Sequence, residues 1–421
     1  MIDIRLFRED LDGLAKLLGR RGVPREDLER IRDLDEERRR LITSGDDLRS
    51  RQRQLSRQIG GAASNEERQE LIGEVKQISA ELDRFEPRQS EVEAQIEAAL
   101  AVIPNLPHPE APDGETDEDA VEVGRFGVKP ELDFEPRDHA ELGELHDLID
   151  LPRGAKVSGS RFAYLKGQLV LLELALIRYV LDRLAERGFT PMLPPVLTRE
   201  EALYGTGFLP TGADQLYQVP ADDLYLVGTS EVPLAAYHSD EILSGADLPI
   251  RYAGFSTNFR REAGTYGKDT RGIFRVHQFD KVEMFVFARP EDAEAEHERL
   301  RETQVDLLSG LGLHGRVVDI PVGDLGASAT RKYDCEVWLP GQGAYRELTS
   351  ASNCTDYQSR RLAIRFRDAE GQATRPVATL NGTACALGRT MIAVLETHQR
   401  ADATVAMPEV LHGYLGFDRI G

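Results

Sequence analysis

Hydrophobic positions in the first hundred residues follow a seven-residue repeat. Between Arg25 and Leu100 apolar side chains recur in two runs, which are Leu34, Leu41, Leu48 and Leu55, then Leu71, Val75, Ile78, Leu82, Val92 and Ile96. Sustained spacing of this kind predicts two helices that pack as a coiled coil. Residues 60–65 (GGAASN) supply a turn and a helix cap, so the helices should be antiparallel and form an arm about 50 Å long. Pro87 should kink the second helix or break one turn of it.

The pattern changes after the Pro-rich residues 103–109 (IPNLPHP), which an acidic stretch from Glu110 to Glu122 follows. We interpret these residues as a linker and divide the chain near residue 103, into segments 1–103 and 104–421. In the second segment, strand-like runs and helices alternate irregularly, which disfavours a doubly wound parallel sheet. The sequence therefore predicts an α+β fold, with the two-helix coiled-coil arm followed by a domain built on an antiparallel sheet flanked by helices.

Composition limits the classes of function. The chain has 421 residues and a formal net charge of −21, which argues against a protein that coats nucleic acid or anionic membrane with its whole surface. Its three cysteines include no Cys-x-x-Cys pair, which excludes a disulfide framework and a zinc site of paired thiolates. Since the N-terminal residues lack an apolar signal core and no apolar run is long enough to span a membrane, we expect a soluble, cytoplasmic protein.

Positive charge is concentrated on the first helix of the arm. Between Arg38 and Arg57 the sequence has seven arginines and two aspartates, a local charge of +5. A solvated helix face is the simpler interpretation. An arginine-only excess within an acidic chain nevertheless suits contacts with phosphate groups. We favour an RNA-binding arm, with the candidate contacts Arg38, Arg39, Arg49, Arg51, Arg53 and Arg57.

Three later segments combine charged residues with apolar patterns. Residues 259–262 (FRRE) and 275–283 (RVHQFDKVE) place Arg and Glu in two strands joined by a polar loop, where charges are costly unless they are paired or bind a ligand. Residues 346–353 (RELTSASN) offer carboxylate and hydroxyl oxygens suited to Mg²⁺. Residues 379–390 run from a strand through a glycine turn into a helix whose first turn carries Arg389, which could meet a phosphate. Walker and dinucleotide-binding glycine patterns are missing from the sequence.

Together these segments resemble the bacterial-type seryl-tRNA synthetases, which are class II aminoacyl-tRNA synthetases. Residues 259–262 and 275–283 resemble motif 2, and Gly388-Arg389 with its helix resembles motif 3. The helix before Pro191 resembles motif 1, which forms the dimer interface in the family. Residues 227–231 (VGTSE) resemble the serine-binding loop of the family. The arm and the linker match as well, so the resemblance covers nearly the whole chain and implies a homodimer.

The resemblance implies ATP-dependent ligation of L-serine to serine tRNA through seryl-adenylate, with release of AMP and pyrophosphate and with Mg²⁺ bound. Arg260 would bridge the serine carboxylate and the α-phosphate, and Arg389 would clamp the γ-phosphate. The implied catalytic residues are Arg260, Glu283 and Arg389. The implied serine-binding residues are Thr229, Ser230, Glu231, Arg260, Glu283, Asn381 and Thr383. The implied ATP-binding residues are Arg260, Arg261, Glu262, Val276, Phe279, Glu347, Leu348, Thr349, Ser350 and Arg389, of which Glu347 and Ser350 would hold the metal. The arm would contact the long variable arm of serine tRNA.

Several alternatives stay open. The intact arm does not separate a housekeeping enzyme from a paralogue of antibiotic synthesis or self-resistance, and selenocysteine tRNA is a further candidate substrate. A coiled-coil scaffold with an inert synthetase-like domain is a rival of another class, which the joint presence of Arg260, Glu283, Glu347 and Arg389 disfavours. The three cysteines are interpreted as packing residues, and His277 as a structural histidine rather than an acid–base group. Lys268 and Arg271 either contact the tRNA acceptor end or are solvated.

Overall fold

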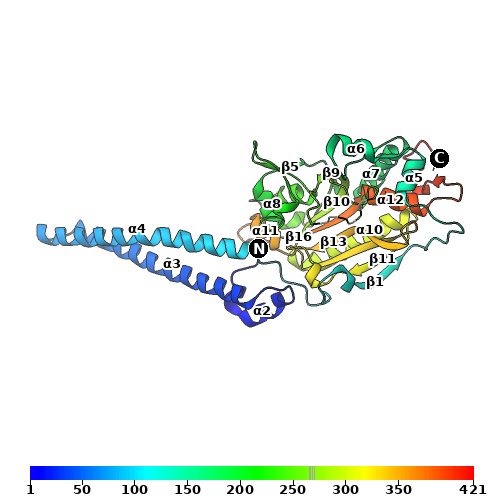
Figure 1. Ribbon diagram of the computed structural model, residues 1–421. Coiled ribbons are helices and arrows are strands. Elements are labelled where there is room, and N and C mark those ends of the chain that lie inside the picture. Colours follow the sequence, from blue (N-terminus) through cyan, green and yellow to red (C-terminus); the bar gives the residue numbers. More distant parts are fainter. Residues whose placement is uncertain (265–266, 268, 270) are drawn as a thin grey trace. The chain divides into compact units, whose positions relative to one another are not determined.

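The computed structural model describes residues 1–264, 267, 269 and 271–421 (Figure 1). They divide into two compact units, Ile2–Pro104 and Asn105–Gly421, and Met1 belongs to the second unit. No helix of the described residues is long and apolar enough to cross a membrane.

The first unit is helical, and two long helices form the predicted arm. Its helices are α1 (Leu6–Glu9), α2 (Leu11–Gly19), α3 (Arg25–Ile59) and α4 (Asn65–Ala101). Leu55, Ile78 and Leu82 are buried between α3 and α4, and the cap Ser64 accepts a hydrogen bond from the backbone N–H of Glu67 at 3.1 Å. The two-helix arm is therefore confirmed. Pro87 lies inside α4, which continues through it without a broken turn, and the alternative of a kink stays a prediction.

A buried carboxylate holds the base of the arm. The side chain of Asp35 is fully buried and accepts bonds from Arg8 at 2.5 and 2.8 Å and from Arg38 at 2.6 Å, while Arg39 lies 3.4 Å away. Burial by itself raises the pKa of Asp35, but the bond to Arg8 and the neighbouring positive charges outweigh it and lower the pKa. Asp35 therefore joins α1 to α3 as an ionised group.

The second unit is built on one large sheet. In the described residues it contains eight strands in the order β1-β11-β12-β13-β16-β10-β9-β4, and every neighbouring pair is antiparallel except β4 and β9. The strands are β1 (Val121–Phe126), β11 (Gly315–Asp319), β12 (Arg331–Leu339), β13 (Ala344–Asn353), β16 (Ala378–Ala386), β10 (Gln278–Ala288), β9 (Ile250–Phe259) and β4 (Thr190–Met192). This agrees with the predicted α+β class.

Helices cover both faces of this sheet, and strand alternation separates a core face from a polar face. Val282, Met284 and Val286 of β10 pack into the main core together with α7 (Gln168–Glu186), α10 (Ala293–Gly310) and α12 (Leu387–Thr397). Lys281 and Glu283 alternate with them and point to the opposite face. The shorter helices α9 (Glu231–Ala236) and α11 (Tyr357–Arg361) contact strands of the sheet, and α8 (Glu200–Thr206) packs against both of these helices.

Smaller elements complete the second unit. They are the helices α5 (His139–Leu145) and α6 (Leu151–Ser158), the strands β2 (Ile149–Asp150), β3 (Tyr164–Leu165), β5 (Leu197–Thr198), β6 (Tyr217–Val219), β7 (Leu224–Leu226), β8 (Ile242–Ser244), β14 (Arg365–Arg367), β15 (Arg375–Pro376), β17 (Val405–Ala406) and β18 (Arg419–Ile420), and short 3₁₀ turns. The expected linker is ordered at its end, because Val121–Phe126 pairs with β11 as the edge strand. Glu122 therefore belongs to the sheet.

Candidate active site

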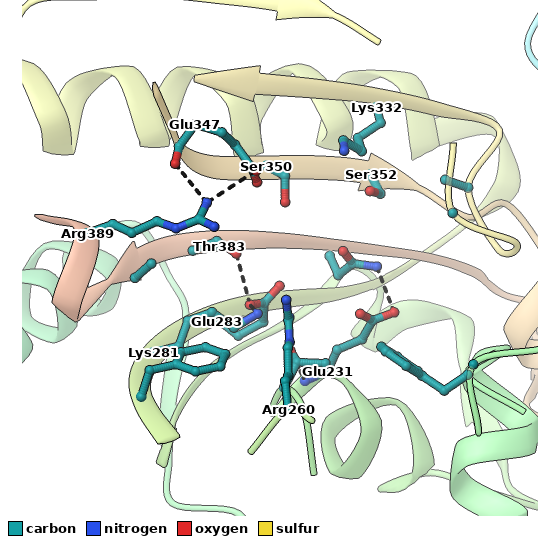
Figure 2. Close-up of a pocket in the computed structure, with 18 of the residues that line it drawn as sticks. Glu231, Arg260, Lys281, Glu283, Lys332, Glu347, Ser350, Ser352, Thr383 and Arg389 are labelled. Atoms are coloured by element: carbon teal, nitrogen blue, oxygen red, sulfur yellow. Dashed lines mark hydrogen bonds and ion pairs between the residues drawn. The ribbon is translucent and has the colours of Figure 1, made fainter. Parts of the chain in front are cut away.

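A cavity of about 530 Å³ opens on the polar face of the sheet (Figure 2). Its volume lies in the usual range for ligand sites. Side chains from strands, helices and loops that are distant in sequence line it. The structure brings together thirteen of the residues predicted for the site: Thr229, Glu231, Arg260, Glu262, Val276, Phe279, Glu283, Glu347, Leu348, Ser350, Asn381, Thr383 and Arg389.

The cavity lies where the ladder between β13 and β16 stops. Ala351 pairs with Gly382, but the next residues toward the cavity, Ser350 and Thr383, are not paired with each other. Gln304 of α10 is fully buried and donates its side-chain amide to both of their carbonyls, at 2.7 and 2.9 Å. A glutamine from the core side thus satisfies the backbone where the two strands separate.

A β-bulge turns Glu347 toward the cavity. Cys335 of β12 pairs with Thr349 and Glu336 pairs with Glu347, so Leu348 is an extra residue in the ladder. Without the bulge, Glu347 and Ser350 would point to opposite faces, since they are three residues apart. With it, both side chains line the cavity, while Thr349 remains buried on the core face.

Glu231 occupies one end of the cavity. Its Oε1 accepts hydrogen bonds from the side-chain amides of Gln358 at 2.8 Å and Asn381 at 3.0 Å. In the described part of the chain its carboxylate forms no ion pair, and its pKa is raised to about 7 by burial and by repulsion from Glu283. A cationic ligand would therefore be stabilised here by the charge of Glu231.

The other carboxylates of the cavity have basic partners. Glu283 lies 2.5 Å from the ammonium of Lys281 and accepts a bond from the Thr383 hydroxyl at 3.3 Å. Glu262 pairs with Arg275 at 2.8 Å, and Glu347 pairs with Arg389 at 3.2 Å. Of these residues, Lys281 and Arg275 were not predicted as site residues, although Lys281 shares its face of β10 with Glu283.

Arg260 lies at the centre of the cavity, between Glu231 on one side and Glu283 on the other, and the Arg389–Glu347 pair lies further out on the Glu283 side (Figure 2). Its Nε donates to the carbonyl of Gly228 at 3.1 Å, and its guanidinium lies 5.2 Å from the ring of Phe279. Among the described residues it forms no ion pair. Burial lowers its pKa, so an anionic ligand would compensate the buried charge.

Aromatic and guanidinium groups form the wall beyond Arg260. The ring of Phe274 lies 3.9 Å from the guanidinium carbon of Arg346 and 4.6 Å from that of Arg389. With Phe279 and Val276, this wall offers flat surfaces of the kind on which a purine base stacks. Phe274 has no distinguishing signal in the sequence.

A second basic residue that the sequence did not single out is Lys332. It lines the cavity from β12 and lies 3.2 Å from the buried Asp334. Burial lowers the pKa of Lys332, but the charges of Asp334 and Glu347 outweigh this effect and raise it. Lys332 is thus a permanent cation. In the sequence it is one charged residue among many, so no local pattern could have identified it.

Three predicted residues do not reach the cavity with their side chains. Ser230 is fully buried and donates its hydroxyl to the carbonyl of Gly254 at 3.1 Å. Arg261 is exposed, with its guanidinium 5.9 Å from the ring of Tyr217. Thr349 faces the core because strand alternation places it opposite Ser350.

The alternatives for motif 2 residues are partly resolved. Arg271 lies 3.1 Å from both Asp138 and Glu141 at the start of α5, so it is paired. The geometry of His277 fits a structural histidine, because its Nδ1 donates a hydrogen bond to the carbonyl of Arg260 at 2.8 Å. Lys268 lies outside the described residues.

The candidate metal ligands Glu347 and Ser350 line the same part of the cavity. No cluster of three or more His, Cys, Asp or Glu side chains able to hold a metal occurs within the described ranges. Two hard oxygen donors fit Mg²⁺, which commonly takes one or two protein ligands and completes its shell with phosphate oxygens and water.

The predicted RNA-contacting arginines lie on α3, and they differ in accessibility. Arg39, Arg51, Arg53 and Arg57 are exposed, and Arg38 and Arg49 are partly buried. Arg38 is engaged by Asp35, as described above, and Arg51 lies 3.4 Å from Glu74 of the facing helix. The Arg51–Glu74 pair is at the surface and therefore weak, so Arg51 can exchange it for another partner, whereas Arg38 is bound to a buried carboxylate.

The fold and cavity define a class II aminoacyl-tRNA synthetase core, and residues 217–398 match the family described as "tRNA synthetase class II core domain (G, H, P, S and T)". Residues 1–107 match "Seryl-tRNA synthetase N-terminal domain". The chain is 52% identical over 419 residues, 99% of its length and 98% of the relative's, to a serine--tRNA ligase of Streptomyces coelicolor. It therefore belongs to the serine--tRNA ligase family.

Solved structures agree with this assignment. The seryl-tRNA synthetase from Pyrococcus horikoshii complexed with ATP superposes with a TM-score of 0.96 at 42% identity, covering 100% of this chain and 99% of that one. A serine-tRNA ligase from Naegleria fowleri in complex with AMP gives a TM-score of 0.90 at 32% identity, covering 100% and 98%.

Proposed function

We propose that this protein ligates L-serine to serine tRNA, using ATP and forming seryl-adenylate as the intermediate. The observation that carries the proposal is the position of Arg260, a partly buried guanidinium without an ion pair among the described residues, which lies between Glu231 and Glu283 with the Arg389–Glu347 pair further out on the Glu283 side (Figure 2). A cation in that position can hold two anions together, the carboxylate of an amino acid and the α-phosphate of ATP.

The carboxylate-lined end suits serine. The ammonium group of the amino acid would lie against Glu231, whose carboxylate accepts only amide hydrogen bonds and forms no ion pair in the described residues. The hydroxyl of serine would bond to the pair formed by Thr383 and Glu283. Alanine would leave these buried polar groups without a partner, which is the basis for strong rejection of an analogue that lacks the hydroxyl. Threonine offers the same hydroxyl, so it must be excluded by the shape of the cavity.

The first step needs no protein nucleophile. A carboxylate oxygen of serine attacks the α-phosphorus in line, the bond to the leaving oxygen breaks, and pyrophosphate departs. Arg260 offsets the charge that develops at phosphorus, and Arg389 holds the outer phosphates. The purine would stack on Phe279, with Glu262 accepting from its amino group. Seryl-adenylate remains, and the terminal ribose hydroxyl of the tRNA then attacks its carbonyl carbon and expels AMP.

Mg²⁺ would be held by Glu347 and Ser350. The ion supplies charge neutralisation to the phosphates when it is bound. The contribution of the chain is to present the two oxygen donors, which the bulge at Leu348 places on one face of the sheet.

The two segments of the chain have separate roles in this proposal. Residues 1–103 form the tRNA-binding segment, whose exposed arginines contact the backbone of the long variable arm, and residues 104–421 form the catalytic segment.

A homodimer is supported by α7, which exposes Val170, Leu171 and Leu174 with 37%, 51% and 58% of their surface accessible. Apolar side chains in a row on one helix are typical of a protein interface. We place the enzyme in the cytoplasm, where charged tRNA is consumed.

The test of the proposal is amino-acid-dependent exchange of pyrophosphate into ATP. Serine should support exchange, alanine should not, and threonine should do so far less efficiently. The control is Arg260→Gln, which should abolish exchange while leaving the fold intact. Absence of serine-dependent exchange in the wild-type protein would contradict the proposal.

A further inference from the structure

His139 lies outside the cavity, at the start of α5, and is buried with 3% of its surface accessible. Three hydrogen bonds fix it. Its Nε2 is 3.2 Å from the backbone nitrogen of Ile273, and its Nδ1 is 3.1 Å from Oε1 of Glu396. Its backbone N–H donates to the same Glu396 oxygen at 3.1 Å. Because both ring nitrogens of this buried histidine form hydrogen bonds, His139 connects the start of α5 to Ile273 and to Glu396.

These contacts determine the protonation state of the ring. The backbone N–H of Ile273 can only donate, so Nε2 of His139 must accept and carries no proton. The proton therefore lies on Nδ1 and is donated to Glu396. Glu396 is fully buried, and its second oxygen accepts from the backbone N–H of Gly341 at 3.0 Å. The ring is thus a neutral imidazole held in one tautomer.

The segment that contacts His139 is shaped to approach it. Gly272 has a φ of +72°, and a Cβ at this position would lie 1.9 Å from Nε2 of His139. Glycine is needed both for this backbone conformation and for the close approach. Next to it, Arg271 pairs with Asp138 and Glu141. The segment that follows the loop between β9 and β10 is therefore held against α5 by two contacts, the close approach of Gly272 to His139 and the ion pairs of Arg271.

The docked segment continues directly into the nucleotide wall. Ile273 and Phe274 both line the cavity, and the ring of Phe274 packs against the guanidinium groups of both Arg346 and Arg389. Glu396 lies on the same helix as Arg389, seven residues or about two turns further on. His139 therefore connects the wall residue Phe274 with the helix that presents Arg389.

We propose that His139 is a positioning residue for ATP, which holds the return segment Gly272–Phe274 in the conformation that closes the nucleotide side of the cavity. The inference rests on the proposed function only in assigning ATP to this side. His139 touches no substrate, and it acts through the backbone of Ile273. Losing its acceptor leaves a buried N–H unsatisfied and releases the wall, whereas the serine end, which is built from β16, α9 and β10, is unaffected.

Two substitutions of His139 test the contributions of its two ring nitrogens separately. The amide of His139→Asn can replace Nδ1 as the donor to Glu396 but does not reach Ile273. The longer amide of His139→Gln can place an acceptor near the position of Nε2. We expect His139→Asn to raise the KM for ATP at least about fivefold in pyrophosphate exchange, with the KM for serine within twofold of the wild type. His139→Gln should restore the KM for ATP to within about threefold.

A third substitution approaches the contact from the other side. Gly272→Ala places a methyl group against His139 and should also raise the KM for ATP without altering that for serine, so the inference stays testable if His139→Asn does not fold. The control is His314→Asn, because His314 is a buried histidine that bonds to Phe126 and Tyr345 and does not line the cavity. It should leave both KM values unchanged.

Specific results would overturn the inference. They are an unchanged KM for ATP in folded His139→Asn or in Gly272→Ala, equal increases in both KM values, or failure of His139→Gln to improve on His139→Asn. Direct titration of ATP by calorimetry, without serine, keeps this test separate from the proposed function. If the wild type gave no serine-dependent exchange, the proposed function would fail, and the titration would still decide whether His139→Asn weakens nucleotide binding.

Discussion

Replacing Gln358 tests how the serine end of the cavity works. The side-chain amide of Gln358 donates to Oε1 of Glu231 at 2.8 Å, and its carbonyl oxygen accepts from the Thr379 hydroxyl at 2.8 Å. The residue is fully buried and does not line the cavity, so it orients Glu231 from behind. The proposed change is Gln358→Met, which keeps the length of the side chain and removes the donor.

The magnitude follows from the bond that is lost. A hydrogen bond to a charged group contributes about 1.5–3 kcal/mol, equivalent to roughly 10- to 150-fold in binding. Asn381 still donates to the same oxygen at 3.0 Å, so we expect the lower end, about a tenfold increase in the KM for serine. The KM for ATP should change less than twofold, because Gln358 is not part of the nucleotide wall.

The pH dependence gives a second readout. Glu231 has a pKa raised to about 7 by burial and by Glu283, while the bond from Gln358 lowers it. Below pH 7 the carboxylate takes up a proton and loses the charge that attracts the serine ammonium, so the wild-type KM for serine should rise as the pH falls. Without Gln358 the pKa rises further, and the profile should shift to higher pH.

The assay is serine-dependent pyrophosphate exchange, measured from pH 6 to 9 with serine and ATP varied in turn. Gln399→Met is the matched control, since Gln399 is also buried but bonds to the backbone of Arg137 and Glu396. An unchanged KM for serine, or a pH profile that does not move, would refute the reasoning. Thermal unfolding should accompany the kinetics to show that both variants are folded.

Three further changes test other parts of the account. Arg260→Lys should lower the rate of pyrophosphate exchange by at least about 100-fold, because an ammonium cannot bridge two anions as a guanidinium does. A smaller loss would contradict the proposal that Arg260 bridges the serine carboxylate and the α-phosphate. Asp35→Asn should destabilise the base of the arm by about 2–4 kcal/mol, seen as faster hydrogen exchange in α1 and α3, and since the pKa of Asp35 is lowered, the wild type should lose this stabilisation only in acid. Replacing Arg49, Arg51 and Arg53 of the arm together with alanine should slow charging of serine tRNA at least about tenfold, while serine-dependent pyrophosphate exchange persists. Unchanged charging would contradict an RNA-binding role for these three arginines.

Local patterns in the sequence were sufficient to predict the arm. The leucine repeat that contains Leu55 and the cap at Ser64 act over one or two helical turns, so they can be recognised without the rest of the chain. Of the two effects expected of Pro87, a broken turn does not occur, because the helix continues through it. A proline removes one hydrogen bond, and the surrounding turns of α4 hold the helix regardless.

Parts of the site that depend on pairing between strands could not be predicted. The bulge at Leu348 sets which way Glu347 and Thr349 point, and it is a property of the ladder between β12 and β13 rather than of either strand alone. Contacts over long distances in the sequence carry no spacing signal either. Gln358 meets Glu231 across 127 residues, and His139 meets Glu396 across 257. Such pairs appear only when the sheet and its helices are assembled.

Esterification of serine tRNA with labelled serine tests the central claim most directly. The account predicts that the purified protein, with ATP and Mg²⁺, transfers serine to serine tRNA, and that a tRNA without its long variable arm is charged much more slowly. The control reaction contains alanine in place of serine and should yield no charged tRNA. Failure to charge intact serine tRNA, in a preparation that binds ATP, would contradict the account.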